Sequence, residues 1–94
     1  MASFTTRVEL HDGTYQDYET LHAAMEREGF SRLIRSDSGQ WYHLPTAEYD
    51  RRGNLTREQV IESAKRAANT TCKSYVVLVT ESASRIWQNL PLAK

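Results

Sequence analysis

The sequence has one cysteine and no long apolar run, and both shortages narrow what the protein can be. Cys72 has no second cysteine with which to form an intrachain disulfide, so a reducing cytosol is the default environment. The longest apolar run, residues 75–79, is far shorter than the roughly 20 residues that span a bilayer. Residues 1–6 lack the basic and apolar regions of a signal peptide. We therefore expect a soluble, cytoplasmic protein with no membrane partner.

The chain also lacks a net charge that would attract a polyanion from a distance. Its 12 basic residues balance its 12 acidic residues, whereas many nucleic-acid-binding domains have a pI above about 9. Any contact with RNA or DNA must therefore depend on a local patch. A glycine-rich phosphate loop, a nucleophile elbow and a zinc motif are also missing from the sequence.

The first half of the chain has clear periodic patterns. Alternating apolar side chains predict a strand over residues 4–10, and three- and four-residue spacing predicts a helix over residues 15–28. Residues 31–35 and 40–43 are short β-prone segments joined by a turn at residues 36–39, which predicts a hairpin.

The second half begins with a weaker pattern. Pro45 cannot donate a ladder hydrogen bond, so residues 46–49 are expected to continue the third strand after a bulge or break. Residues 50–54 are polar and are expected to form a loop. Thr56 and Gln59 have the spacing of a capping box, which fixes the start of a second helix.

The order of these elements predicts the fold class. Residues 75–79 are apolar on both faces and predict a fourth strand, after which residues 85–87 can return as a short fifth strand. A β-α-β-β-α-β order predicts one α+β domain over residues 1–94, a ferredoxin-like sandwich. Its four-stranded antiparallel sheet would carry two helices on one face, with strands one and three central and strand four at an edge. An apolar edge needs a cover, so we expect either the fifth strand to cover it or a homodimer to form through residues 75–79 and 85–87.

Candidate catalytic residues follow the first strand. Asp12, at its end, could bind a metal such as Mg²⁺, but one carboxylate is a poor site without a second acid, or a second Asp12 across a dimer. The alternative is that Asp12 and Gly13 form an ordinary turn. His11 and His43 could transfer protons to and from a ribose, if the first and third strands are neighbours with matching registers. The alternative is two ordinary strand histidines.

Basic and aromatic residues alternate in the middle and end of the chain. Arginines could contact phosphates while rings stack on unpaired bases, which would make an RNA-binding surface. The alternative is a charged surface over buried aromatic side chains. The candidate RNA-binding residues are Arg32, Arg35, Trp41, Tyr42, Arg51, Arg52 and Arg85.

Five stretches of the chain, residues 4–11, 18–26, 29–30, 42–49 and 77–82, resemble the GhoS family of small bacterial proteins. The resemblance implies an antitoxin of a toxin-antitoxin system, an endoribonuclease that cleaves the message for a small membrane toxin. It also implies a fold similar to that of the small CRISPR-associated ferredoxin-like ribonucleases. Asp12 matches the acidic residue that recurs at the end of strand one in that related fold.

Two classes of function remain open at this point. The first is an RNA-acting, antitoxin-like protein, which either cleaves single-stranded mRNA as an endoribonuclease or only binds it. The second is a non-catalytic protein-binding module or homodimeric regulator, favoured by the zero net charge, the two-faced strand and the apolar residues near position 90. Acylphosphatase-like hydrolysis is disfavoured, because no phosphate-binding loop with its arginine follows the first strand.

Overall fold

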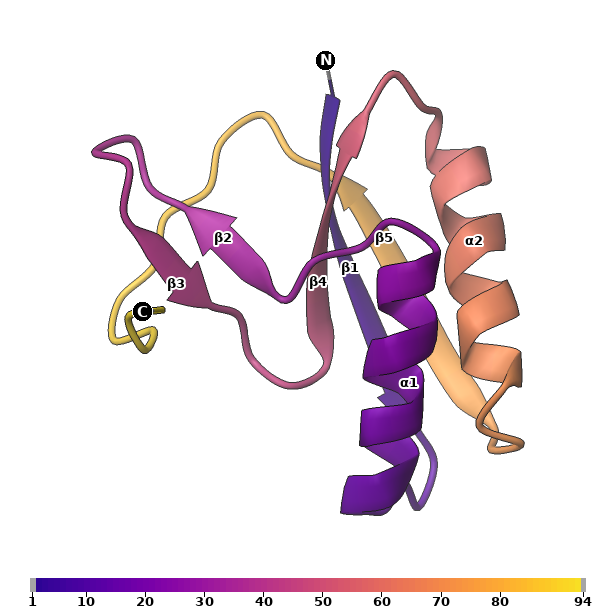
Figure 1. Cartoon of the computed structure of the whole chain (residues 1–94). Coiled ribbons are helices and arrows are strands. Elements are labelled where there is room, and N and C mark those ends of the chain that lie inside the picture. Colours follow the sequence, from indigo (N-terminus) through magenta and orange to yellow (C-terminus); the bar gives the residue numbers. More distant parts are fainter. Residues whose placement is uncertain (1, 94) are drawn as a thin grey trace.

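The computed structural model describes residues 2–93 and has two parts (Figure 1). We call the first part the body; it consists of β1 (Ala2–Leu10), α1 (Tyr15–Arg27), β4 (Glu48–Gly53), α2 (Arg57–Asn69) and β5 (Tyr75–Glu81). We call the second part the arm; it consists of β2 (Leu33–Arg35), β3 (Trp41–His43) and the tail, residues 82–93. None of the described helices is long and apolar enough to cross a membrane.

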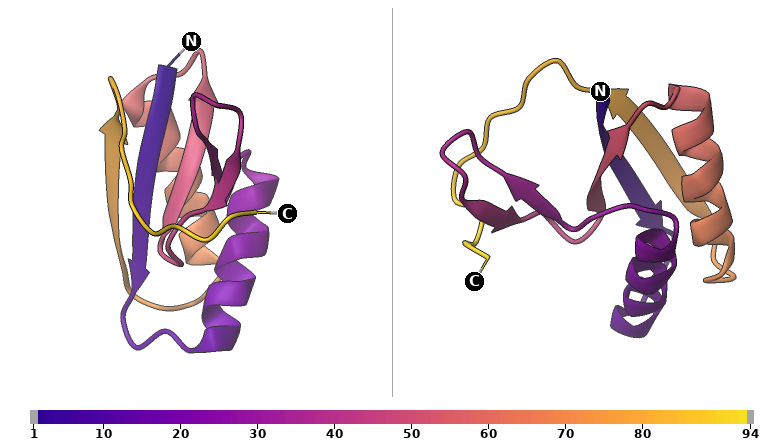
Figure 2. Two further views of the ribbon diagram at one scale, coloured as in Figure 1. Left: turned by 90° about the vertical axis from the view of Figure 1, so that its left-hand side faces the viewer. Right: turned by 45° about the horizontal axis from the view of Figure 1, so that its top comes forward.

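The body is a three-stranded antiparallel sheet covered by two helices on one face (Figures 1 and 2). The strand order is β4-β1-β5, so β1 is central and β5 is at an edge, as predicted. Capping boxes start both helices, and the one before α2 is the one that the sequence predicts. Thr14 pairs with Asp17 before α1, and Thr56 pairs with Gln59 before α2.

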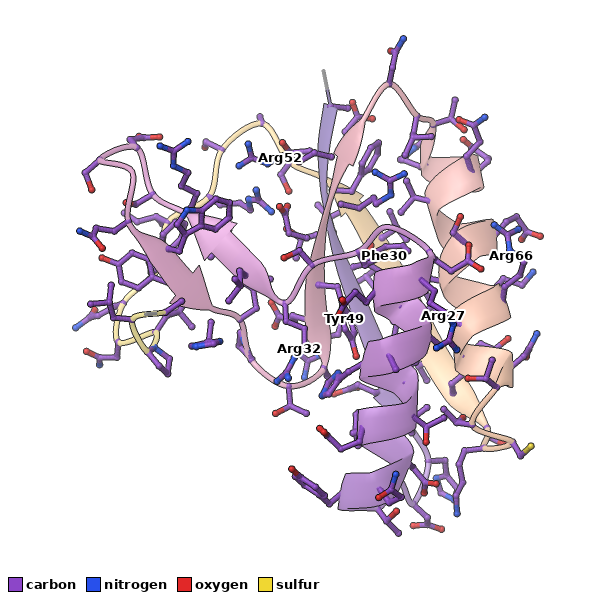
Figure 3. All side chains as sticks on the ribbon, viewed as in Figure 1. Arg27, Phe30, Arg32, Tyr49, Arg52 and Arg66 are labelled. Carbon is purple, nitrogen blue, oxygen red and sulfur yellow. The ribbon has the colours of Figure 1, made fainter. Side chains whose placement is uncertain are left out.

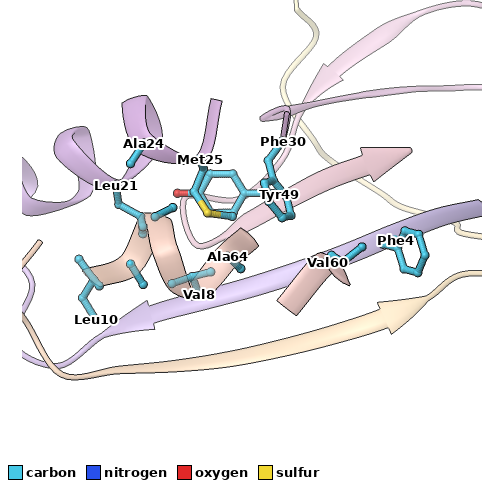
Figure 4. Packing of buried hydrophobic residues seen from close by; sticks show 12 residues of the cluster. Phe4, Val8, Leu10, Leu21, Ala24, Met25, Phe30, Tyr49, Val60 and Ala64 are labelled. Atoms are coloured by element: carbon cyan, nitrogen blue, oxygen red, sulfur yellow. The ribbon is translucent and has the colours of Figure 1, made fainter. Parts of the chain in front are cut away.

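Alternation along β1 places the core between the sheet and the helices. Phe4, Thr6, Val8 and Leu10 point toward the helices and are buried, while Thr5, Arg7 and Glu9 face the other way. Figure 4 shows Leu10 on the side of Leu21 of α1, Val8 beside the small Ala64 of α2, and Phe4 beside Val60 of α2. Small residues on α2 let this helix lie close to the sheet.

The α+β class is confirmed, but the single four-stranded ferredoxin-like sheet is wrong. Strands β2 and β3 pair with each other in a separate two-stranded sheet. An isolated bridge between Ser31 and Asp50 joins this hairpin to the body. The predicted third strand is therefore divided. Its first part forms β3 away from β1, whereas the continuation expected after Pro45 contributes Glu48 and Tyr49 to β4, with Tyr49 opposite Thr6 of β1.

The prediction of a polar loop at residues 50–54 was also wrong, because most of this segment belongs to a strand. Asp50, Arg51 and Arg52 belong to β4, although charged residues are poor strand formers. Strand alternation sends Arg51 to the helix side, near Gly29, and sends Asp50 to the other face. Asp50 can be buried there because arginine side chains pair with it.

The predicted fifth strand at residues 85–87 does not form. The tail leaves β5 and crosses to the β2–β3 hairpin (Figure 2, right), where the Ala93 N–H donates to the carbonyl of Trp41 over 2.8 Å. The His43 N–H donates to the carbonyl of Pro91 over 2.9 Å. The backbone of the tail thus pairs with β3 and not with β5. Within residues 2–93 no strand pairs with the outer edge of β5.

Candidate functional site: an arginine-lined pocket between body and arm

A pocket of about 380 Å³ lies between the uncovered face of the sheet and the arm. Its walls come from segments far apart in the sequence: Ser3 and Arg52 from the body, Arg35 from β2, and Arg85 and Trp87 from the tail. Figure 3 shows Arg52 on the side of the body that faces the arm. Three guanidinium groups therefore line one concave site.

Asp50 organises two of these arginines. Its position in β4 is opposite Thr5, and Arg52 is opposite Ser3, so strand periodicity places Asp50 and Arg52 on the same face. Nη1 of Arg85 donates to Oδ1 of Asp50 over 2.7 Å and to the Thr5 hydroxyl over 3.1 Å. Nε of Arg52 lies 3.4 Å from Oδ2 of Asp50. Asp50 itself is only 7% exposed.

Aromatic side chains adjoin the pocket on the arm. The guanidinium of Arg35 lies 5.8 Å from the centre of the Trp41 ring, a cation–π arrangement. Tyr42 and Trp87 meet edge to face with ring centres 5.6 Å apart, which attaches the tail to β3. Trp41 is 46% exposed, so its ring is available for stacking.

The structure thus gathers most, but not all, of the predicted RNA-binding residues. Arg35, Arg52 and Arg85 line the pocket, and Trp41 and Tyr42 adjoin it. The remaining two arginines lie elsewhere. Arg51 is on the helix face of β4 against the end of α1, where its Nε would be 3.0 Å from a Cβ added to Gly29. Arg32 lies near Tyr49 on the α1 side (Figure 3).

A half-buried histidine and a buried tyrosine form a second polar cluster, beside Arg32. Nδ1 of His22 lies 2.7 Å from the hydroxyl of the fully buried Tyr49. Burial lowers the pKa of His22, and the charge of Arg32 lowers it further, while Glu19 opposes this change. Burial raises the pKa of Tyr49. The imidazole of His22 and the Tyr49 hydroxyl therefore form a hydrogen bond between neutral groups, which makes the pair part of the body's packing.

The predicted catalytic residues are split between two places. His11 and Asp12 are in contact, with Nε2 of His11 3.3 Å from Oδ2 of Asp12, and their side chains are 78% and 83% exposed. Asp12 has a φ of 54°, typical of the turn that was the alternative interpretation. His43 is on β3, which pairs with β2. The expectation that it lies on a strand neighbouring β1 is therefore wrong.

The surroundings of Asp12 do not fit a magnesium ion. Its ion-pair partner in the described part of the chain is His11, an imidazole, whereas Mg²⁺ prefers oxygen ligands. Residues 2–93 contain no group of three or more His, Cys, Asp or Glu side chains placed to hold a metal. The side chains around Asp12 therefore support no metal-dependent chemistry at this position.

Sequence reasoning missed Asp50 and Thr5, which bind Arg85, and Ser82, which lines the pocket. The Thr5 and Ser82 hydroxyls lie 3.2 Å apart beside Arg85. The signal that could have revealed Asp50 is the alternation of Tyr49 and Arg51 with Asp50 and Arg52, a period of two that is typical of a strand.

No protein-family model and no curated protein matches this chain. The resemblance to the GhoS family therefore stays a prediction, and the pocket has to be interpreted from its own chemistry.

Proposed function

We propose that this protein binds single-stranded RNA in the arginine-lined pocket. The observation that carries the proposal is the convergence of Arg35, Arg52 and Arg85 from three separate segments onto one pocket. Guanidinium groups match the geometry of phosphate oxygens and can bind them through two parallel hydrogen bonds. The site supplies local positive charge that the neutral chain lacks as a whole, because three guanidinium groups face two carboxylates, Asp37 and Asp50.

The aromatic side chains support a single strand as the ligand. Trp41 presents an exposed ring beside Arg35, and Trp87 lines the pocket itself. Base stacking on such rings requires unpaired bases, and the deep major groove of duplex RNA does not admit them. Serine hydroxyls along the wall, among them Ser36 and Ser84, add hydrogen-bonding groups for a sugar or a phosphate.

Fluorescence anisotropy with a labelled single-stranded RNA tests the proposal, with a duplex of the same sequence for comparison. Arg35→Ala and Arg52→Ala should each weaken binding, and each lost phosphate contact should flatten the plot of log affinity against log salt by roughly 0.7. Arg27→Ala is the matched control, because Arg27 is an exposed arginine on α1 (Figure 3). Absence of binding at low salt, or an equal loss in all three variants, would contradict the proposal.

Cleavage of the bound RNA is a second proposal, motivated by the contact between His11 and Asp12. The imidazole of His11 can accept the proton of a ribose 2′-hydroxyl while that oxygen attacks the adjacent phosphorus. The P–O5′ bond then breaks, the leaving 5′-oxygen takes a proton from water, and the Asp12 carboxylate stabilises the imidazolium that forms. With the same labelled RNA, the fragment pattern measures cleavage and anisotropy measures affinity. Asp12→Asn should lower cleavage and leave affinity unchanged. An unaltered fragment pattern in this variant would remove the catalytic role.

The third proposal is a homodimer formed by the free edge of β5. Val76 and Leu78 point away from the helices and are 66% and 60% exposed. An antiparallel pair of β5 strands with Leu78 on the twofold axis would cover these side chains and bring no like charges opposite each other. Residues 85–87 do not take part, because the tail runs to the arm.

A further inference from the structure

Asp50 is an unusual feature for a site that is proposed to bind an anion. It is a buried carboxylate in contact with two of the three guanidinium groups of the pocket. The negative charge of Asp50 repels a phosphate, so charge alone predicts that Asp50 weakens phosphate binding. Its retention therefore needs a physical reason.

The hydrogen-bond pattern supplies one. Arg85 uses Nη1 for both Asp50 and Thr5, and Arg52 approaches Asp50 through Nε. In the described part of the chain no protein acceptor is found for Nη2 of Arg85 or for either Nη of Arg52. Both residues line the pocket. Asp50 thus fixes two long, flexible side chains by one part of each guanidinium and leaves other N–H groups for a ligand.

We propose that the pocket is a phosphate-binding subsite and that Asp50 is its positioning residue. Holding the guanidinium groups in place before binding removes much of the side-chain entropy cost of ordering them around a phosphate. Arg35 and the hydroxyls of Ser3 and Ser82 line the same pocket and can supply further donors. The inference rests on the proposed function only in taking RNA as the source of the phosphate.

Substitution of Asp50 distinguishes positioning from charge. Asp50→Asn removes a negative charge, so charge counting predicts tighter phosphate binding. Positioning predicts the opposite, because the amide retains one acceptor oxygen and cannot hold both guanidinium groups. We expect affinity to fall about tenfold, as for the loss of one charge-assisted hydrogen bond.

Asp37 provides the matched control. It lines the same pocket from the β2–β3 turn, is exposed, and forms no ion pair among the described residues. Asp37→Asn removes the same charge without releasing an arginine, so it should leave phosphate affinity unchanged or raise it. Tighter binding in both variants would overturn the positioning role.

The measurements are calorimetric titrations of the whole protein with inorganic phosphate, and with the same single-stranded RNA carrying either a 5′-phosphate or a 5′-hydroxyl. A preference for the 5′-phosphate identifies the chain end as the source of the phosphate, and equal binding identifies the internal phosphodiesters. Phosphate binding without RNA binding would contradict the proposed function and leave the subsite standing. RNA binding that is indifferent to Asp50→Asn would overturn the subsite alone.

Arg52→Lys keeps the test decisive if Asp50→Asn fails to fold. The side chain of Arg52 is half exposed, and lysine preserves its charge while removing the planar fork. We expect weaker phosphate binding with an unchanged melting temperature and an unchanged salt dependence. Wild-type phosphate affinity in this variant would contradict the proposal.

Discussion

The body and the arm are held together by different forces. In the body, side chains from all three strands and helices meet in one apolar core, with Phe4 and Leu21 fully buried. The arm buries Ile34, but Ile86 is 97% exposed and Trp41 nearly half exposed. Its tail is attached by the Arg85–Asp50 ion pair, the Tyr42–Trp87 contact and backbone hydrogen bonds to β3.

This difference explains where the candidate site lies. A core of packed side chains gives a rigid wall, and a lightly attached arm gives a wall that can adjust to a ligand. Asp50 belongs to both parts, because its backbone pairs with Ser31 and its side chain pairs with Arg85. The pocket is therefore located where the two kinds of stabilisation meet.

The largest expected effect comes from the body. Phe4→Ala should lower the free energy of unfolding by about 3–5 kcal/mol, because it leaves a cavity between β1 and α2. Trp87→Ala in the tail should cost less than about 1.5 kcal/mol, the upper end for one aromatic pair. Urea unfolding measures both. Equal losses would show that body and arm form a single cooperative core.

The connection between the two parts should have an intermediate effect. Arg85→Ala leaves Asp50 buried with a weaker partner, so we expect a loss of about 1–3 kcal/mol. Arg66→Ala is the control, because Arg66 pairs with Glu28 on the exposed surface of the helices (Figure 3), where water screens the ion pair, and its loss should have little effect. A loss no larger for Arg85 than for Arg66 would contradict the linking role.

A smaller effect is expected from pH, and it should originate in the body. Burial lowers the pKa of His22, so the unfolded chain binds a proton more readily than the folded one. The contribution of this histidine to stability is complete above its ordinary pKa of about 6.5 and is lost as the pH falls below that value. Unfolding curves between neutral and mildly acidic pH should show this decline.

His22→Gln should reduce the decline. An identical pH dependence in wild type and His22→Gln would show that other groups cause the decline.

The smallest effect on monomer stability is expected at the outer edge of β5. Leu78→Lys changes an exposed position and should alter the free energy of unfolding by no more than about 0.5 kcal/mol at low protein concentration. Sedimentation at higher concentration should nevertheless show loss of the dimer. Ile86→Lys on the tail is the control and should leave the dimer intact. A wild-type protein that stays monomeric would remove the homodimer proposal.

Local sequence signals predicted much of the body and the β2–β3 hairpin of the arm, but not the position of that hairpin or the course of the tail. Capping residues such as Thr56 and the alternation from Phe4 to Leu10 act over a few positions, so a sequence shows them directly. The charged part of β4, residues 50–52, was predicted as a loop because its charges are satisfied by distant partners. Arg85 is 35 positions from Asp50, and no periodic pattern connects them.

The same distance limits what could be predicted of the candidate site. Arginine and tryptophan content indicated an RNA-binding surface. Only the fold shows that Arg52 and its neighbour Arg51 lie on opposite faces of the sheet. The course of the tail was also hidden. Its backbone hydrogen bonds to β3 use groups that every residue has, so they leave no mark in the sequence.

The central position of β1 has a consequence for synthesis. β1 leaves the ribosome before β5, yet it has to pair with β5, and contacts such as that between Thr5 and Ser82 join residues 77 positions apart. Until β5 has emerged, the edge of β1 that it will cover has no partner, and closing so long a loop slows folding. An open strand edge can pair with another unfinished chain, so the body gains protection against aggregation when β5 joins the sheet.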